Sequence, residues 1–222
     1  MVTHALQADQ PFQIVFLRLW DLMRAKWSKE YKRMLEQAGL VLPVSRAIRF
    51  GARFQQKRVP TRYCPFDFVI RLLGALESKG RSLYILGGKP AELKLVDGNL
   101  RQTFPGIRLL GRYIGTYPKG HHDSVLTALR KADPDFVLIG SGPAARERWV
   151  ARNRAFLPAG IYLWSAEVFE ILAYKRRRVP REVFERGTDA IAEAFRRPWR
   201  VARLPVYCWY LLLLLYHRAR HL

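Results

Sequence analysis

The sequence predicts an α/β fold of the Rossmann-like type, with a mainly parallel sheet and helices on both faces. Three apolar stretches of strand length end in glycine and lead into stretches of helix length: SLYILGGKPAE from residue 82, FPGIRLLGRYIG from residue 104 and ADPDFVLIGSGPAA from residue 132. Strands that alternate with helices imply right-handed βαβ units and parallel pairing. Half of the 222 residues are hydrophobic (50%), which provides a substantial core and argues against a disordered chain.

The elements follow one another along the chain, and short apolar runs indicate the strands while apolar residues at three-to-four spacing indicate the helices. Asp67 is expected to cap the helix that follows it. The helix expected over 45–57 carries Arg46, Arg49, Arg53 and Lys57 on one face. The expected strands are 13–17, 40–42, 82–86, 107–110, 136–139 and 161–163. The expected helices are 19–37, 45–57, 68–78, 91–102, 123–131, 146–155, 166–174 and 181–195.

The character of the sequence changes after Tyr174, where a basic run and Pro180 are followed by a further expected helix. No acidic residue follows Glu193. We therefore expect two parts: an α/β domain over 1–180 and a basic, aromatic helical appendage over 181–222.

The net charge of +21 predicts a polyanionic partner. Nucleic acid, anionic lipid and phosphorylated substrates all fit that charge, but no helix-turn-helix, RRM or zinc-finger signature supports nucleic acid, which is therefore the disfavoured partner. Cys64 and Cys208 form no CxxC pair, so neither a disulfide framework nor a zinc site is indicated. The adjacent His121 and His122 also lack metal-site spacing. The N-terminal residues do not resemble a signal peptide, which favours the cytoplasm.

Two glycine clusters stand where ligands of α/β sheets bind, beyond the carboxyl ends of strands. They are Gly87-Gly88 and Gly140-Ser141-Gly142. One interpretation is a phosphate or nucleotide cradle of backbone amides. The other is ordinary strand-to-helix turns that need glycine conformations. Neither cluster is a GxGxxG or Walker A motif.

The same segments resemble the WecG/TagA/CpsF family of bacterial glycosyltransferases. That family typically shows Gly-Gly after a strand, an aspartate-led strand ending in GxGxPxQExW, and a later FDxxxG…RAP stretch. The chain has GGKP at 87–90, DPDFVLIG at 133–140, GSGPAARERW at 140–149 and FEILAYKRRRVP at 169–180. The resemblance extends over about residues 13–203.

The resemblance implies transfer of an N-acetylhexosamine-type sugar from a UDP donor to a polyprenyl-pyrophosphate-linked sugar, in cell-envelope polysaccharide synthesis at the cytoplasmic membrane face. It implies no cofactor and no essential metal, and the sequence is compatible with a homo-oligomer. Matching the motifs residue by residue, the donor-binding candidates are Gly87, Gly88, Gly140, Ser141, Gly142, Arg146 and Trp149.

The chain departs from the family pattern at several pocket positions. Val44 stands where the family's proposed general base, an aspartate, is expected, and valine cannot accept a proton. The other replacements are Phe16 and Arg18 in a Thr-x-Asn motif, Ala144 and Arg146 in GxGxPxQE, Glu170 and Tyr174 in FDxxxG, and Trp164 and Glu167 in place of small residues.

Two explanations follow from these replacements. The pocket is rebuilt, with Asp67, Glu147 or Glu170 supplying the catalytic carboxylate, or the chain is a catalytically degenerate relative that acts as a membrane-surface binding or scaffold protein. Each carboxylate also has a structural interpretation: a cap for Asp67, a first-turn acid for Glu147 and an ion-paired surface residue for Glu170.

The apolar run 204–216 is too short for a transmembrane helix, which needs about 20 residues. Aromatic and basic residues within and around it predict an interfacial membrane anchor, whereas the alternative is a C-terminal helix packed on the body or on another subunit. The family's C-terminal appendage is associated with the membrane and directs arginines toward the acceptor diphosphate. The candidates for both contacts are Arg196, Arg197, Arg200, Arg203, Trp199 and Trp209.

Overall fold

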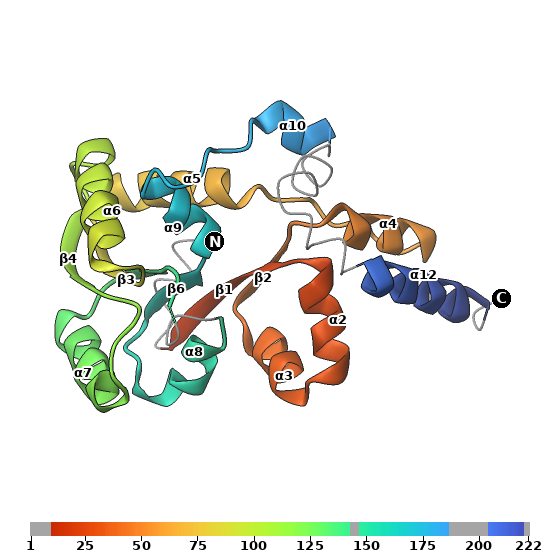
Figure 1. Cartoon of the computed structure of the whole chain (residues 1–222), viewed down its shortest axis with the longest axis horizontal. Helices are drawn as coiled ribbons and strands as arrows, with labels where there is room; N and C mark the ends of the chain where they lie inside the picture. The colour runs from red at the N-terminus through yellow and green to blue at the C-terminus, as the bar shows by residue number, and fades with distance from the viewer. Residues whose placement is uncertain (1–9, 143–146, 187–203, 220–222) are drawn as a thin grey trace. The chain divides into compact units, whose positions relative to one another are not determined.

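The computed structural model describes residues 10–142, 147–186 and 204–219 (Figure 1). Its strands are β1 (Pro11–Leu17), β2 (Leu40–Pro43), β3 (Ser82–Leu86), β4 (Arg108–Tyr113), β5 (Phe136–Ile139) and β6 (Gly160–Trp164). Its helices are α2 (Leu19–Trp27), α3 (Lys29–Gln37), α4 (Arg46–Phe54), α5 (Pro65–Glu77), α6 (Pro90–Thr103), α7 (His122–Ala132), α8 (Glu147–Arg152), α9 (Ala166–Leu172), α10 (Arg181–Arg186) and α12 (Leu204–Ala219), with 3-10 turns η1 (Lys119–His121) and η2 (Arg154–Phe156).

The strands form one six-stranded sheet in the order β2-β1-β6-β5-β3-β4. The pairings from β1 through to β4 are parallel, with Pro11 opposite Gly160 and Phe136 opposite Ile161. The carboxyl ends of these strands therefore meet at one edge of the sheet. The predicted Rossmann-like α/β fold is confirmed.

Helices cover both faces of the sheet. On one face, strand residues such as Tyr84, Leu86 and Val137 pack with Leu129 of α7 and Val150 of α8. The alternate strand residues are also buried, and α5, α6 and α9 lie on that opposite side (Figure 1). Burial on both faces explains why the central strands are continuous apolar runs without a polar alternation.

The chain folds as two compact units. Among the described residues, the sheet unit comprises 10–16, 33–41, 65–142 and 147–178, and the helical unit comprises 17–32, 42–64, 179–186 and 204–219. The glycine loops lie in the sheet unit, whereas α4 and α12 lie in the helical unit.

Two sequence expectations about helices are wrong in detail. The single helix expected over 19–37 is two helices, because the Ser28 hydroxyl accepts a hydrogen bond from the Tyr31 amide (3.2 Å) and starts α3. Asp67 does not cap a helix that begins at Phe68, since α5 already begins at Pro65 and Asp67 lies in its first turn. Proline suits that first position because its missing N–H has no intrahelical partner there.

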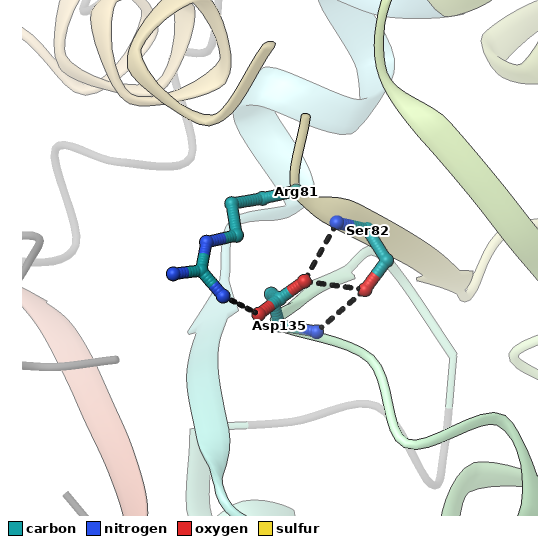
Figure 2. A network of polar contacts seen from close by, with 3 residues as sticks. All are labelled: Arg81, Ser82 and Asp135. Atoms are coloured by element: carbon teal, nitrogen blue, oxygen red, sulfur yellow. Dashed lines mark hydrogen bonds and ion pairs between the residues drawn. The ribbon is translucent and has the colours of Figure 1, made fainter. Parts of the chain in front are cut away.

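A polar network fixes the amino ends of β3 and β5 (Figure 2). One carboxylate oxygen of Asp135 accepts hydrogen bonds from the Ser82 amide (2.8 Å) and the Ser82 hydroxyl (2.7 Å), and the other lies 3.1 Å from the Arg81 guanidinium. The Asp135 amide in turn donates to the Ser82 hydroxyl (3.0 Å). Burial alone would raise the pKa of Asp135, but these bonds and the Arg81 charge hold it below its ordinary value. The aspartate that leads the third glycine-ended strand is therefore a structural residue at the edge away from the glycines.

In the helical unit, α12 packs one face against α2 and α4. Tyr210 and Leu214 of α12 are buried with Leu19 and Met23 of α2, and Ala47 of α4 lies against the same cluster. Within the described residues, none of the helices has both the length and the apolar character needed to cross a membrane.

Candidate functional site

The direction of the chain reverses between two neighbouring strands of the sheet. From β3 the chain passes through α6 to β4 on one side, whereas from β5 it passes through α8 to β6 on the other. Ligands of open α/β sheets bind beyond the carboxyl ends of strands at such a reversal. The predicted glycine clusters follow these two strands, so the fold brings Gly87-Gly88 and Gly140-Ser141-Gly142 together at that point.

Backbone hydrogen bonds join three loops at this edge. The third loop contains Gly115 and follows β4. The bonds run from the Gly87 amide to Tyr113 O (2.9 Å), from the Gly88 amide to Ser141 O (2.7 Å), from the Gly115 amide to Gly88 O (3.0 Å) and from the Gly140 amide to Leu86 O (2.8 Å). The amides of Gly87, Gly88 and Gly140 therefore have partners within the protein. The backbone segments Gly87-Gly88, Gly115 and Gly140–Gly142 are therefore closely packed, and we call them the backbone platform.

The platform leaves no room for side chains. A Cβ on Gly115 would lie 2.2 Å from Ser141 O and 2.9 Å from both Gly87 Cα and Gly88 N. Gly142 has φ +146°, which side-chain-bearing residues rarely adopt, and a Cβ there would lie 2.6 Å from Gly115 C. Because the obstructing atoms belong to backbone, a small side-chain shift cannot relieve either contact.

The ring of Phe169 in α9 supports the platform from one side. A Cβ on Gly88 would lie 2.6 Å from this ring, and a Cβ on Gly140 would lie 2.5 Å from it. Ser165 begins α9 by accepting a hydrogen bond from the Val168 amide (3.3 Å), immediately after β6. Residues of the first turns of α9 are therefore neighbours of the glycine loops.

A carboxylate paired with a lysine adjoins the platform. Glu92 in the first turn of α6 accepts a hydrogen bond from the Lys89 amide (3.0 Å) and forms an ion pair with Lys175. Burial alone would raise the pKa of Glu92, but the Lys175 and Lys89 contacts hold it below its ordinary value. Because the charges of two lysines act on this one carboxylate, the net charge next to Gly88 is positive.

Aromatic rings form a second feature beside the loop that follows β4. Tyr117 in this loop stacks on His122 (ring centroids 6.4 Å apart) and meets Tyr113 edge to face (5.7 Å). His122 also meets Trp149 of α8 edge to face (6.3 Å), and its Nε2 lies 2.9 Å from Asn153 Oδ1. His122 is thus part of an aromatic cluster. In the described part of the chain, no three His, Cys, Asp or Glu side chains lie close enough together to hold a metal ion.

Three buried polar atoms around this cluster have no hydrogen-bond partner among the described residues: the Tyr117 hydroxyl and the indole nitrogens of Trp149 and Trp164. Burial raises the pKa of Tyr117, and the nearby Trp149 indole partly opposes that rise without forming a hydrogen bond of normal geometry. An unpaired buried polar group costs about 1–3 kcal/mol, so a water molecule or a ligand is the expected partner.

The three candidate carboxylates have different surroundings. Asp67 forms an ion pair with Arg178 (2.7 Å), whose guanidinium also stacks on Phe66. Glu170 on α9 lies 4.0 Å from Arg176, while Arg176 lies closer to Glu167 (3.2 Å). Asp67 and Glu170 therefore face arginines from one short segment. Glu147 begins α8, elsewhere in the sheet unit, and its carbonyl accepts a hydrogen bond from buried Gln13 (2.8 Å).

The residues that replace the family's polar positions are largely structural. Phe16 is buried and meets Phe68 edge to face (5.8 Å). Val44 is buried in the helical unit, and its amide donates to Leu17 O (3.0 Å). Arg18 precedes α2, and its amide donates to Asp21 (3.3 Å). Tyr174, at the position where the resemblance implies a glycine, has φ +57°, a left-handed backbone conformation that favours glycine.

Several candidates lie outside the described residues: Ala144, Arg146, Arg196, Arg197, Trp199, Arg200 and Arg203. Trp209 is described, and its side chain is exposed on α12.

Sequence reasoning did not identify Gly115, Tyr117, Glu92 or Lys175 as parts of this edge. For Glu92 a signal was present, because an acid three residues after a helix start is typical of a capping box. For Gly115 the signal was a glycine soon after a predicted strand, but that strand was expected to end at residue 110 and it continues to Tyr113.

Comparison with known proteins agrees with this architecture. A profile described as "Glycosyl transferase WecG/TagA/CpsF family" matches residues 1–222. The N-acetylglucosaminyldiphosphoundecaprenol N-acetyl-beta-D-mannosaminyltransferase of Bacillus subtilis (strain 168) is 22% identical over 179 residues, which cover 79% of this chain and 68% of that protein. With the match covering its full length, the chain belongs to the WecG/TagA/CpsF family of glycosyltransferases.

Proposed function

We propose that this protein transfers an N-acetylhexosamine-type sugar from a UDP donor to a polyprenyl-diphosphate-linked sugar during cell-envelope polysaccharide synthesis. The observation that carries the proposal is the backbone platform at the β3–β5 reversal, in a chain of a glycosyltransferase family. The Bacillus subtilis relative, by its name, acts on a diphosphoundecaprenol-linked sugar, which supports this class of acceptor.

The donor diphosphate is proposed to lie against Gly142 and the amino end of α6. That helix directs its positive end to the platform, and Lys89 precedes it. Gly87, Gly88, Gly140 and Ser141 hold the loops close enough for a ligand to approach backbone. Arg146 belongs to the same site in this proposal.

The nucleoside is proposed to adjoin the aromatic cluster. The unpaired polar atoms of Tyr117, Trp149 and Trp164 are the groups that a ring carbonyl or ribose hydroxyl would satisfy. Uracil presents two such carbonyls, which is consistent with a UDP donor.

Glu170 is the carboxylate that we favour as general base, in the place of Val44. Its helix carries Phe169 beneath the platform, and its nearest described arginine contact is longer than that of Asp67 (4.0 Å against 2.7 Å). The longer arginine contact leaves the Glu170 carboxylate more accessible to a substrate hydroxyl. Asp67 and Glu147 remain alternatives. Glu170→Gln is expected to lower turnover by about 10²–10⁴ with UDP affinity unchanged.

The acceptor is proposed to meet residues 181–222 at the cytoplasmic face of the membrane, with the protein bound peripherally. Arg196, Arg197, Arg200 and Arg203 are the proposed diphosphate contacts, and Trp199 and Trp209 the proposed headgroup contacts.

Calorimetric titration with UDP tests the donor site, with GMP as the specificity control. We expect saturable, UDP-selective binding tighter than about 1 mM, or −4.1 kcal/mol. Turnover with UDP-sugars and a polyprenyl-diphosphate-linked acceptor then tests the transfer. A folded protein that does not discriminate UDP from GMP would contradict the proposal and favour a non-catalytic relative.

A further inference from the structure

The two faces of α12 have different environments. Tyr210 and Leu214 are buried against the rest of the helical unit. The opposite face is apolar yet exposed, with exposed fractions between 45% and 58% for Tyr207, Trp209, Leu211, Leu212, Leu215 and Tyr216. A soluble helix normally shows the reverse arrangement, with polar side chains outward. The exposed apolar face of α12 therefore requires a partner.

α4 is fixed beside α12 by close contacts (Figure 1). The Tyr210 hydroxyl donates to Ala47 O (3.2 Å) and the side-chain Nε2 of Gln55 donates to Leu214 O (2.7 Å). Arg218 donates to Phe54 O (2.8 Å) and lies over the Phe54 ring. Gly51 allows this approach, since a Cβ there would lie 1.8 Å from the Tyr210 hydroxyl. These contacts hold α4 and α12 against each other.

The outward face of α4 is basic. Arg46, Arg49 and Arg53 are exposed along it, with Phe50 exposed between them. In the part of the chain that the structure describes, none of these arginines forms an ion pair with a carboxylate. The segment from 37 to 66 contains no Asp or Glu, and its cations are Arg46, Arg49, Arg53, Lys57, Arg58 and Arg62.

Resting on the peripheral membrane contact proposed above for residues 181–222, we propose that α4 extends this contact, so that α4 and α12 together form the surface that binds an anionic phospholipid bilayer. α12 places its exposed leucines and aromatic residues at the level of the acyl chains and headgroups, and the arginines of α4 contact lipid phosphates. The 16 residues of α12 extend about 24 Å, less than the roughly 30 Å of a bilayer core, so the helix lies in the interface.

Charge and apolar surface together select this partner. A nucleic acid would be attracted by the arginines but gains nothing from exposed leucines. A second copy of the chain could cover the leucines but would bring a second set of unpaired arginines to the contact. An anionic bilayer satisfies both surfaces at once. α4 lies more than 100 residues before the appendage, so the surface is wider than the C-terminal segment.

Co-sedimentation of the full chain with vesicles tests the proposal, using phosphatidylcholine alone and phosphatidylcholine with about one-third phosphatidylglycerol. The α4 variant is Arg46→Gln, Arg49→Gln, Arg53→Gln. The control is Arg108→Gln, Arg130→Gln, Lys131→Gln, which removes the same charge from exposed positions of the sheet unit. The α12 variant is Leu211→Gln, Leu212→Gln, Leu215→Gln.

We expect strong partition to anionic vesicles, weakened about 100-fold in the α4 variant, since each arginine contributes about fivefold at such a surface. The α12 variant should also lose partition, and the control should bind within severalfold of the unaltered protein. Equal losses in the α4 variant and its control would overturn the proposal, because total charge would then be decisive. Light scattering that shows a dimer dissociated by the α12 variant, without vesicle binding, would also overturn it. UDP titration of the α4 variant separates these results from any failure of the donor site.

Discussion

At the amino ends of β3 and β5 one carboxylate joins the two strands, whereas at their carboxyl ends the hydrogen bonds described between the loops run from backbone to backbone. Asp135 holds the Ser82 amide and hydroxyl on one side and Arg81 on the other. At the other end, Gly88 bonds to Ser141 and Gly115 bonds to Gly88, without any side chain.

The difference shows how one pair of strands meets two demands. Side-chain hydrogen bonds join the strands at the edge opposite the proposed donor site. At the edge where we propose that the donor binds, glycines bring the loops into close contact without side chains of their own. The contacts at the amino ends of β3 and β5 therefore depend on particular side-chain groups, and those at the carboxyl ends depend on the absence of a Cβ.

The largest effect should come from disrupting the glycine loops at the carboxyl ends of β3 and β5. Gly115→Ala places a Cβ against three backbone atoms of neighbouring loops, so we expect a loss of about 3 kcal/mol in unfolding free energy and loss of UDP binding. Gly98→Ala is the matched control, because Gly98 lies in α6 with no atom within 4 Å of the added Cβ. It should gain about 0.5–1 kcal/mol. Urea unfolding and UDP calorimetry measure both, and similar behaviour of the two variants would refute the close-packing argument.

Disrupting the Asp135 network at the amino ends of β3 and β5 should lower the unfolding free energy and leave UDP binding unchanged. Asp135→Ala leaves the Ser82 amide and hydroxyl without their acceptor, which is expected to cost about 2–3 kcal/mol. UDP affinity should remain within twofold, because the network lies at the opposite end of the strands. A parallel loss of stability and affinity, seen in urea unfolding and calorimetry, would mean that the two ends are coupled.

Acid should weaken both ends, because each has a carboxyl group with a lowered pKa, Asp135 at one and Glu92 at the other. The folded state then binds fewer protons than the unfolded state, so stability rises with pH in this window. The contribution is present above the unfolded values of 3.8 and 4.5 and is lost as the pH falls through the lowered folded values. Urea midpoints at pH 6 and pH 3 should differ less in Asp135→Asn and Glu92→Gln than in the unaltered protein. An unchanged difference would count against both assignments.

The smallest effect concerns backbone strain at Tyr174, just after α9. Tyr174 adopts φ +57° just after α9 and is 71% exposed, so Tyr174→Gly removes an unfavourable backbone conformation with little loss of packing. We expect a gain of about 0.5–1 kcal/mol, or 1–3 °C in Tm. Tyr174→Ala keeps the Cβ and should give no gain. Equal Tm changes for the two variants would exclude relief of backbone strain.

Local patterns predicted the fold because the central strands are buried on both faces and end in glycine. The bounds of β3 and β5 agree with the expected strands. The single helix expected over 19–37 is interrupted at Ser28, whose hydroxyl accepts the hydrogen bond that starts α3. The rule that ligands bind beyond the carboxyl ends of strands also singled out Gly87 and Gly140, which the structure places at one edge of the sheet.

The rest of the candidate site depends on pairs that are distant in sequence. Lys175 meets Glu92 across 83 residues, and Arg178 meets Asp67 across 111. Charge patterning within a helix reports neighbours three or four residues apart, so it carries no information on such pairs. For the same reason the sequence could not show which candidate carboxylates face arginines.

The pairing of β1 with β6 also affects how the protein is made. Pro11 lies opposite Gly160, so β1 leaves the ribosome long before β6, its partner on one side, has been synthesised. At about 5–20 residues per second, that delay is roughly 10–30 s. During this time the apolar stretch Pro11–Leu17, mostly buried in the folded protein, lacks its neighbour and is a natural target for chaperones that bind nascent chains.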